Sequence, residues 1–150
     1  MTTTPSTTAP LADAPVLALA QAIHGVLRHV LARHGVTFRQ QVVLRAAVTA
    51  DAPQTPDEIL TRIRRSLRVD PADIRATVGE LLAKQLLTED GAHLLPTDAG
   101  RELLAAVGAE TAPIAAHILA STPAEDLAAA GRVLALVTER ADAQPAGLTA

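Results

Sequence analysis

The residues best suited to chemistry are four closely spaced arginines: Arg62, Arg64, Arg65 and Arg68. Contacts to the phosphates of a nucleic acid supply much of the affinity of a binding protein, and they require only positive charge near the backbone. Arg64 and Arg68 are four residues apart and share a face if the segment is helical. The cluster therefore indicates either a phosphate-binding surface or a solvated arginine face paired with nearby acids, and position alone does not separate the two.

The other reactive side chains form no standard catalytic pattern. His24, His29 and His34 recur at five-residue steps, which rotate each ring by about 140° from the last on a helix, so they cannot converge on one metal ion. Ser66 and Ser121 have no histidine and carboxylate in a recognisable motif, and there is no glycine-rich phosphate loop. With no cysteine in the chain, thiolate sites are excluded as well. We expect no catalytic residues, no metal and no cofactor.

The arginines lie in a segment whose helix starts are clearly marked. Thr55 with Pro56 and Glu58 forms a capping box with proline at the first helical position. Asp70 with Pro71 repeats the pattern of a capping residue followed by proline. The first helix is therefore expected to end at about residues 67–69. Asp90-Gly91 predicts a type I′ hairpin turn, and Thr97 caps a further helix. The order of helix, turn, second helix, hairpin and helix predicts a winged helix-turn-helix over residues 55–100.

The second of these helices would enter the major groove of DNA. Its inward side is expected to carry Ile74, Val78, Leu81, Leu82 and Gln85. Its outward side carries Asp73, Ala76, Glu80 and Ala83, with Arg75 and Thr77 on the flanks. We therefore predict that Arg75 and Thr77 contact bases and that the four arginines contact phosphates.

The helices outside this unit have wide apolar faces. A first helix runs from about Pro15 to Gly35, a second follows Thr37, the helix from Thr97 is expected to kink or break at Pro113, and Thr122-Pro123 starts the last. The small winged unit cannot cover both terminal helices, so we expect a homodimer. The alternative is a monomer whose terminal helices pack on each other.

The composition bounds the class of protein. The 150 residues are 49% apolar but only 1% aromatic, which predicts one domain with an aliphatic core. Net charge is −3, and residues 55–101 hold seven bases against eight acids, a balance of −1. No uninterrupted apolar run approaches the roughly 20 residues of a membrane span, and the first fifteen residues lack the basic start of a signal peptide. We expect a cytoplasmic protein with no membrane partner.

Residues of about 16 to 142 resemble the MarR family of winged-helix transcriptional regulators. The resemblance is carried by Gln40, Val43 and Leu44, then Val69, Asp70 and Pro71, then Leu81, Lys84, Leu86 and Leu87, and finally Asp90, Leu95, Thr97, Asp98, Ala99, Gly100 and Arg101, with 122–142 similar to the closing dimer helix. It implies a mainly α (α+β) winged helix-turn-helix fold. It also implies dimerisation helices at 16–36 and 98–142 and a winged lobe at 37–97. Residues 1–15, which are rich in Thr, Pro and Ser, and residues 143–150 are expected to be flexible tails.

The same resemblance implies a function. A homodimer would bind a pseudo-palindrome in duplex DNA, with half-sites about one helical turn apart, and a small aromatic or anionic effector would bind between the dimer helices and the lobe. Ligand candidates near that angle are His24, Arg28, Arg45 and His117, with Arg39 close by. His24 and Arg28 are one turn apart and could jointly face an anion. Taken singly, His24 could equally be a partly exposed helix residue and Arg28 half of an ion pair between subunits.

Two departures from the family pattern leave other functions open. The outward face of the second helix has Ala76 and Glu80 where the family often has basic residues, and the wing, Asp90 to His93, has no arginine. A fold that has lost DNA binding could serve as a ligand carrier, or as a cofactor-free enzyme with His24 or His117 as general base. A protein-interaction module that binds a basic partner through the acidic face is a third possibility.

Overall fold

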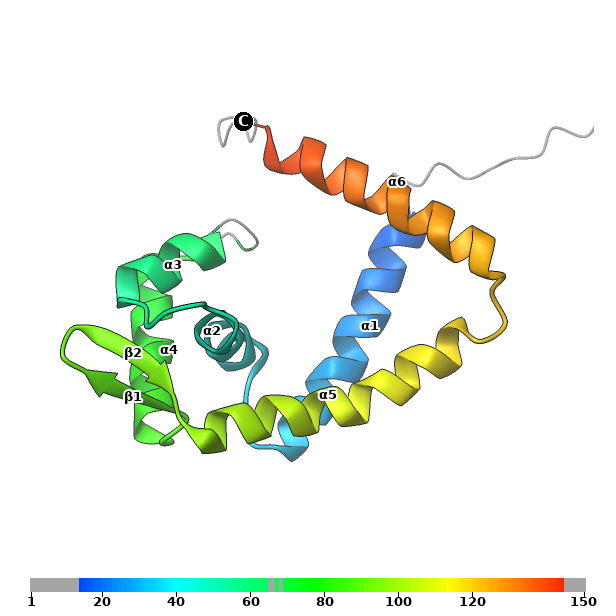
Figure 1. The fold of residues 1–150 in the computed structure, drawn as a ribbon. Helices are drawn as coiled ribbons and strands as arrows, with labels where there is room; N and C mark the ends of the chain where they lie inside the picture. The colour runs from blue at the N-terminus through cyan, green and yellow to red at the C-terminus, as the bar shows by residue number, and fades with distance from the viewer. Residues whose placement is uncertain (1–13, 65–66, 68, 145–150) are drawn as a thin grey trace, which may run out of the picture.

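The computed structural model describes residues 14–64, 67 and 69–144. The fold is mainly helical with one small antiparallel sheet, as the sequence predicts (Figure 1). The elements are α1 (Ala14–Arg33), α2 (Phe38–Val48), α3 (Pro56–Arg64), α4 (Pro71–Ala83), β1 (Leu87–Asp90), β2 (His93–Pro96), α5 (Asp98–Leu119) and α6 (Ala124–Asp142). We call α2, α3, α4, β1 and β2 together the winged lobe.

The helices of the winged lobe begin where local side chains can satisfy their free amides. At α2 the Thr37 hydroxyl accepts from the Gln40 amide while the Gln40 side chain accepts from the Thr37 amide, both at 3.1 Å. Thr55 and Glu58 make the same reciprocal pair at α3. At α4 the Asp70 carboxylate accepts from the backbone at 2.8 Å. Each such cap is worth about 1 kcal/mol, and the predicted starts are confirmed.

The structure differs from the sequence prediction at the hairpin turn and at the start of α6. The hairpin pairs Asp90 with His93, so its loop is Gly91-Ala92 and not Asp90-Gly91. Gly91 has φ +61° and Ala92 has a negative φ, which is the pattern of a type II′ turn, whereas type I′ needs a positive φ at both positions. At α6 the cap residue is Pro123, and no side chain caps the helix, so Thr122 does not do so.

The core lies inside the winged lobe and is aliphatic. Its most completely buried side chains include Val43, Leu44, Ile59, Ile74, Leu81 and Leu87. The end of α1 adds Val30 and Leu31, and α5 adds Val107. The lobe and the adjoining parts of α1 and α5 therefore share one hydrophobic core.

Gly100 lets α5 pass close to the strand end. A Cβ at this position would overlap the carbonyl oxygen of Leu86. Thr97, which caps α5 through the Gly100 amide at 3.0 Å, also donates its hydroxyl to the Gln85 carbonyl at 2.7 Å. The contact fixes the direction in which α5 leaves the lobe.

Helices α1, α5 and α6 extend away from the lobe as an open frame (Figure 1). Pro113 lies inside α5 and does not interrupt it. No residue of α6 is buried, and its Val133, Leu134, Leu136 and Val137 are between 42% and 54% exposed. Helices α1 and α5 also carry exposed apolar side chains, all of which line the hollow between these two helices: Leu19, Ile23, Ile114, Ile118 and Leu119.

Helix α5 is long and apolar enough, by length and composition alone, to cross a membrane, and within the described part of the chain no other helix is. This corrects the expectation that no segment approaches such a length. The expectation considered uninterrupted apolar runs, whereas a mean over α5 tolerates its Glu102 and Glu110. In the folded chain Gly100 and Val107 of this helix are buried, and Glu110 pairs with side chains at the end of α1.

Candidate functional site

The solvent-facing side of α4 is made mainly of small residues. Ala72, Arg75, Ala76, Gly79, Glu80 and Ala83 are exposed. Thr77 is 2% exposed, and its hydroxyl donates to the Asp73 carbonyl at 2.8 Å. Thr77 is therefore not presented for contact with bases. Its position one turn after Ile74 and beside Val78 could have indicated this burial from the sequence.

The acids on and beside α4 each have a partner. Gln40 of α2, which is buried, donates its side-chain amide to the Glu80 carboxylate at 2.6 Å. Arg39 lies 3.5 Å from Asp73, and Arg75 lies 3.7 Å from Asp57 in the first turn of α3. These pairs are exposed and individually weak. They nevertheless offset the negative charge that the sequence places on this surface.

The described arginines of the predicted phosphate-binding cluster lie in the last turn of α3. Arg64 is exposed, and Arg62 is exposed with a guanidinium nitrogen 3.3 Å from the Thr49 carbonyl. Arg65 and Arg68 lie outside the described residues. Arg75 is 65% exposed and stands beside the opposite end of α3. Cationic groups thus lie at both ends of α3: Arg75 beside its first turn, and Arg62 and Arg64 in its last turn.

A second candidate site is a cleft of about 400 Å³ between α1 and α5. Its walls are almost entirely aliphatic, with Ile23 and Val26 on α1 facing Ile114 and Ile118 on α5. Arg45 of α2 is the charged residue of the lining. A mostly apolar cleft with one fixed charge is suited to an organic ion.

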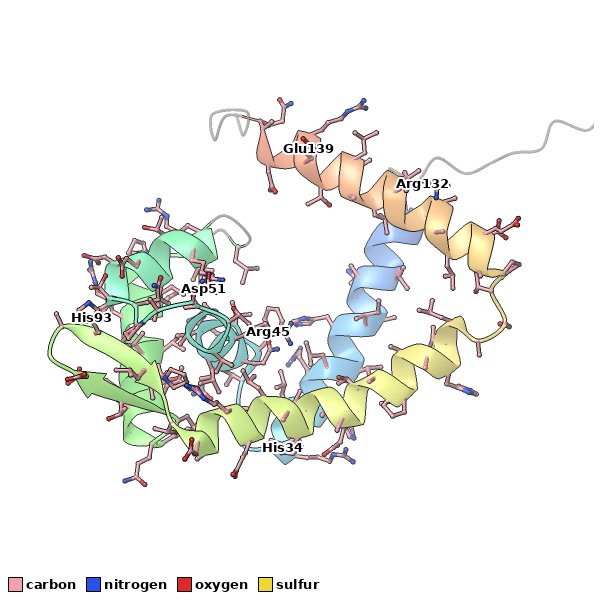
Figure 2. All side chains as sticks on the ribbon, in the orientation of Figure 1. His34, Arg45, Asp51, His93, Arg132 and Glu139 are labelled. Atoms are coloured by element: carbon pink, nitrogen blue, oxygen red, sulfur yellow. The ribbon has the colours of Figure 1, made fainter. Side chains whose placement is uncertain are left out.

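Arg45 is held in place by its own helix. Gln41, one turn earlier, is 3% exposed. With its amide oxygen turned toward Arg45, it accepts from the guanidinium at 3.2 and 2.6 Å. Figure 2 shows Arg45 on the side of α2 that faces α1. The residue also lines a second hollow of about 400 Å³ beside Phe38 and Arg62, so its guanidinium stands between two cavities.

Of the four predicted ligand residues, Arg45 alone lines the α1–α5 cleft. His24 is half-buried, and its ring meets the Phe38 ring edge-on with centroids 4.6 Å apart. Arg28 and His117 are exposed and outside the cleft lining. The structure therefore does not bring His24, Arg28, Arg45 and His117 together. No group of three or more potential metal ligands occurs among the described residues.

The sequence interpretation missed the buried glutamines. Gln40 is 5% exposed and links α2 to α4, and Gln41 orients Arg45. The capping-box spacing from Thr37 to Gln40 was a readable signal for part of the role of Gln40. Its contact with Glu80, forty residues away, leaves no local pattern.

Solved structures share the fold of this chain. No protein-family model and no curated protein matches the sequence. MarR from Staphylococcus aureus, solved in complex with salicylate and kanamycin, is similar with a TM-score of 0.72 at 20% identity over 82% of this chain and 85% of that one. A MarR family protein from Bacillus stearothermophilus has a TM-score of 0.70 at 16% identity, covering 83% and 89%. A MarR family protein from Mycobacterium tuberculosis in complex with DNA has a TM-score of 0.63 at 22% identity, covering 83% and 98%.

These similarities define the class of the fold. The chain has the winged-helix fold of MarR family structures, as its sequence resemblance implies. The identities are low, so the functions of those proteins are not transferred by the comparison itself.

Proposed function

We propose that this protein is a ligand-responsive transcriptional regulator that binds pseudo-palindromic duplex DNA as a homodimer. The observation that carries the proposal is the exposed side of α4, where the nearby acids are partnered and arginines flank the helix. In a helix-turn-helix this surface enters the major groove. The M. tuberculosis protein of the same fold was solved with DNA.

The cationic residues would have distinct roles. Arg75 extends from the exposed side of α4 and is the candidate for base contacts, while Arg62, Arg64, Arg65 and Arg68 are the candidates for phosphate contacts. Thr77 is left out because it is buried. With small residues along α4 and no arginine in the wing, affinity would come more from backbone charge than from base readout.

The homodimer would form through the segments 16–36 and 98–142. Among the described residues, nothing buries the apolar side chains of α6. Burying them against a second copy removes apolar area from water. A two-fold dimer would present two winged lobes to half-sites about one turn apart.

The effector would be a small organic anion with an apolar body. Its body would fill the α1–α5 cleft, and its charge would bind Arg45, whose guanidinium is already oriented by Gln41. Salicylate, present in the S. aureus structure, belongs to this chemical class. The protein would act in the cytoplasm with its DNA and without a membrane partner. In support, Val107 of α5 belongs to the core and Glu110 pairs with the end of α1.

The test is a salt-titrated binding assay with the duplex that flanks the gene of this protein, run beside a nonspecific duplex of equal length. If the protein is a regulator, we expect it to bind the gene-flanking duplex at least a hundred-fold more tightly than the nonspecific duplex. This threshold lies below the roughly 10³-fold preference that is the usual lower bound for sequence-specific DNA-binding proteins. Its affinity should fall steeply with salt because counterions are released from the phosphates. Equal binding to both duplexes contradicts the proposal.

The alternative is a protein of the same fold that has lost DNA binding and uses the cleft as a carrier or a cofactor-free enzyme. The donor-poor exposed side of α4 is the observation in its favour. Between the two forms, the structure favours a carrier. The proposed general bases, His24 and His117, are outside the cleft lining. Failure to bind any duplex at low salt, together with ligand binding, would select this alternative.

A further inference from the structure

The short turn between α1 and α2, which we call the α1–α2 turn (Arg33, His34 and Gly35), is bonded on both of its sides. One side faces α5, and the other faces the end of α4. These are the two helices whose positions matter for the cleft and for DNA.

On the α5 side, the bonds converge on Glu110. Its carboxylate lies 2.7 Å from the Nε2 atom of His34 and also binds the Arg33 guanidinium. A carboxylate only accepts hydrogen bonds, so Nε2 of His34 is the donor. Figure 2 shows His34 where the end of α1 passes beside α5. The next residue in α5, Thr111, lines the cleft, so this junction directly adjoins the cleft wall along α5.

On the α4 side, the bonds converge on Lys84. Its ammonium group donates to the Gly35 carbonyl at 2.5 Å and to the Gln40 side-chain oxygen at 3.2 Å. Gln40 in turn donates to Glu80, one turn earlier in α4. Gly35 has φ +69°, a backbone conformation that glycine adopts without strain. The C-cap of α4 is thus attached to Gly35, the residue that directly follows the two that hold α5, Arg33 and His34.

We propose that the α1–α2 turn couples occupancy of the α1–α5 cleft to the position of α4. A ligand that changes the separation of α1 and α5 must either break the Glu110 contacts or carry the turn with it, and the turn carries Lys84. Packed elements respond to such a displacement by shifting as units, since close-packed interiors deform little. The inference rests on the proposed function, because it names the route by which an effector alters DNA affinity.

The coupling can be tested without knowing the effector. The chain has no cysteine, so Ala115→Cys places a unique thiol in the cleft lining. Modification with hexyl methanethiosulfonate then fills the cleft covalently. The matched control is Ala116→Cys, an exposed neighbour on the same helix that is not part of the lining. Light scattering before and after modification verifies that the oligomeric state is unchanged.

The expected result is a change in duplex affinity of at least about fivefold on hexylation of Ala115→Cys, within the range usual for coupled sites. Hexylation of Ala116→Cys should change it less than twofold. Adding Glu110→Gln, which removes the charge that binds Arg33, should reduce the effect at Ala115→Cys to less than twofold. Glu102→Gln, on an exposed side chain of the same helix with no ion pair in the described chain, should leave the effect intact.

Lys84→Met provides an independent break on the other side of the turn. Methionine is unbranched like lysine but lacks the group that donates to the Gly35 carbonyl. This variant can therefore replace Glu110→Gln if Glu110→Gln is too unstable for the assay. An equal hexylation effect with and without these substitutions overturns the coupling route, and so does the absence of any effect. Neither result affects the proposed function, which fails only if the unmodified protein does not bind duplex DNA.

Discussion

Arg45 shows how one residue can define the chemistry of a cavity. It is the charged side chain among aliphatic neighbours, and Gln41 beneath it is buried and already bonded to it. A guanidinium that is oriented before the ligand arrives loses less conformational freedom on binding. If the cleft binds an effector as proposed, Arg45 would favour anions over neutral ligands of the same shape.

We predict that Arg45→Met weakens the binding of a carboxylate probe by roughly 10- to 100-fold, since hydrogen bonds to charged groups contribute about 1.5–3 kcal/mol. Isothermal titration calorimetry with salicylate and with octanoate measures the loss. Benzyl alcohol, which is neutral, is the control ligand, and its affinity should change little. A similar loss for all three would show that Arg45 acts through the shape of the cleft and not through its charge.

Gly100 supports a second prediction at this scale. Gly100→Ala should destabilise the protein by roughly 1–3 kcal/mol, because the added Cβ overlaps a backbone oxygen that cannot easily move. Gly108→Ala, in the same helix with open space around its Cβ, should instead stabilise by about 0.5–1 kcal/mol. Urea unfolding of both variants measures the difference. Equal effects would contradict the close approach of α5 to Leu86.

At the scale of elements, the pair α3 and α4 carries the proposed DNA surface. We predict that Arg64→Ala weakens binding to all duplexes alike and reduces the slope of log affinity against log salt by about 1. The control is Arg132→Ala, which removes the same charge from α6, far from the lobe (Figure 2). Fluorescence anisotropy over a salt series provides both slopes. A loss confined to one duplex sequence would reassign Arg64 to base contact.

The sequence predicts an element well when the interactions that define it join residues close together in the chain. The caps at Thr37, Thr55, Asp70 and Thr97 link residues two or three apart, so their spacing is visible in the chain and the helix starts are predicted well. The hairpin register depends on how two strands pair, so the central loop residues were misplaced by one position.

The candidate site is predicted less well because its contacts are distant in sequence. Glu80 is exposed, as helix periodicity predicts, but its hydrogen bond from Gln40, forty residues earlier, was not predicted. Glu110 binds His34 across seventy-six residues. Such pairs depend on the crossing of helices, which periodicity does not specify. Arg45, which lines the α1–α5 cleft, was a ligand candidate only by family resemblance, and its neighbour Gln41 was not considered.

At the scale of the whole molecule, the open frame of α1, α5 and α6 predicts self-association. Leu134→Glu on α6 should convert the proposed dimer to a monomer, because a charge would replace an apolar side chain in the interface. Size-exclusion chromatography with light scattering should give twice 15.5 kDa for the native chain and about 15.5 kDa for the variant. Glu139→Gln, a polar change on the same helix, is the control. A native monomer at micromolar concentration would remove the two-half-site geometry.

The absence of any buried residue in α6 has a consequence for expression in the cell. A helix that the described part of its own chain leaves uncovered is marginal alone in water, so its order should grow with the amount of protein synthesised. At low concentration, the winged lobe would be folded while α6 remained frayed. Only at higher concentration would the chains dimerise and α6 become ordered. The gene dosage itself would then set a threshold below which transcription is left untouched.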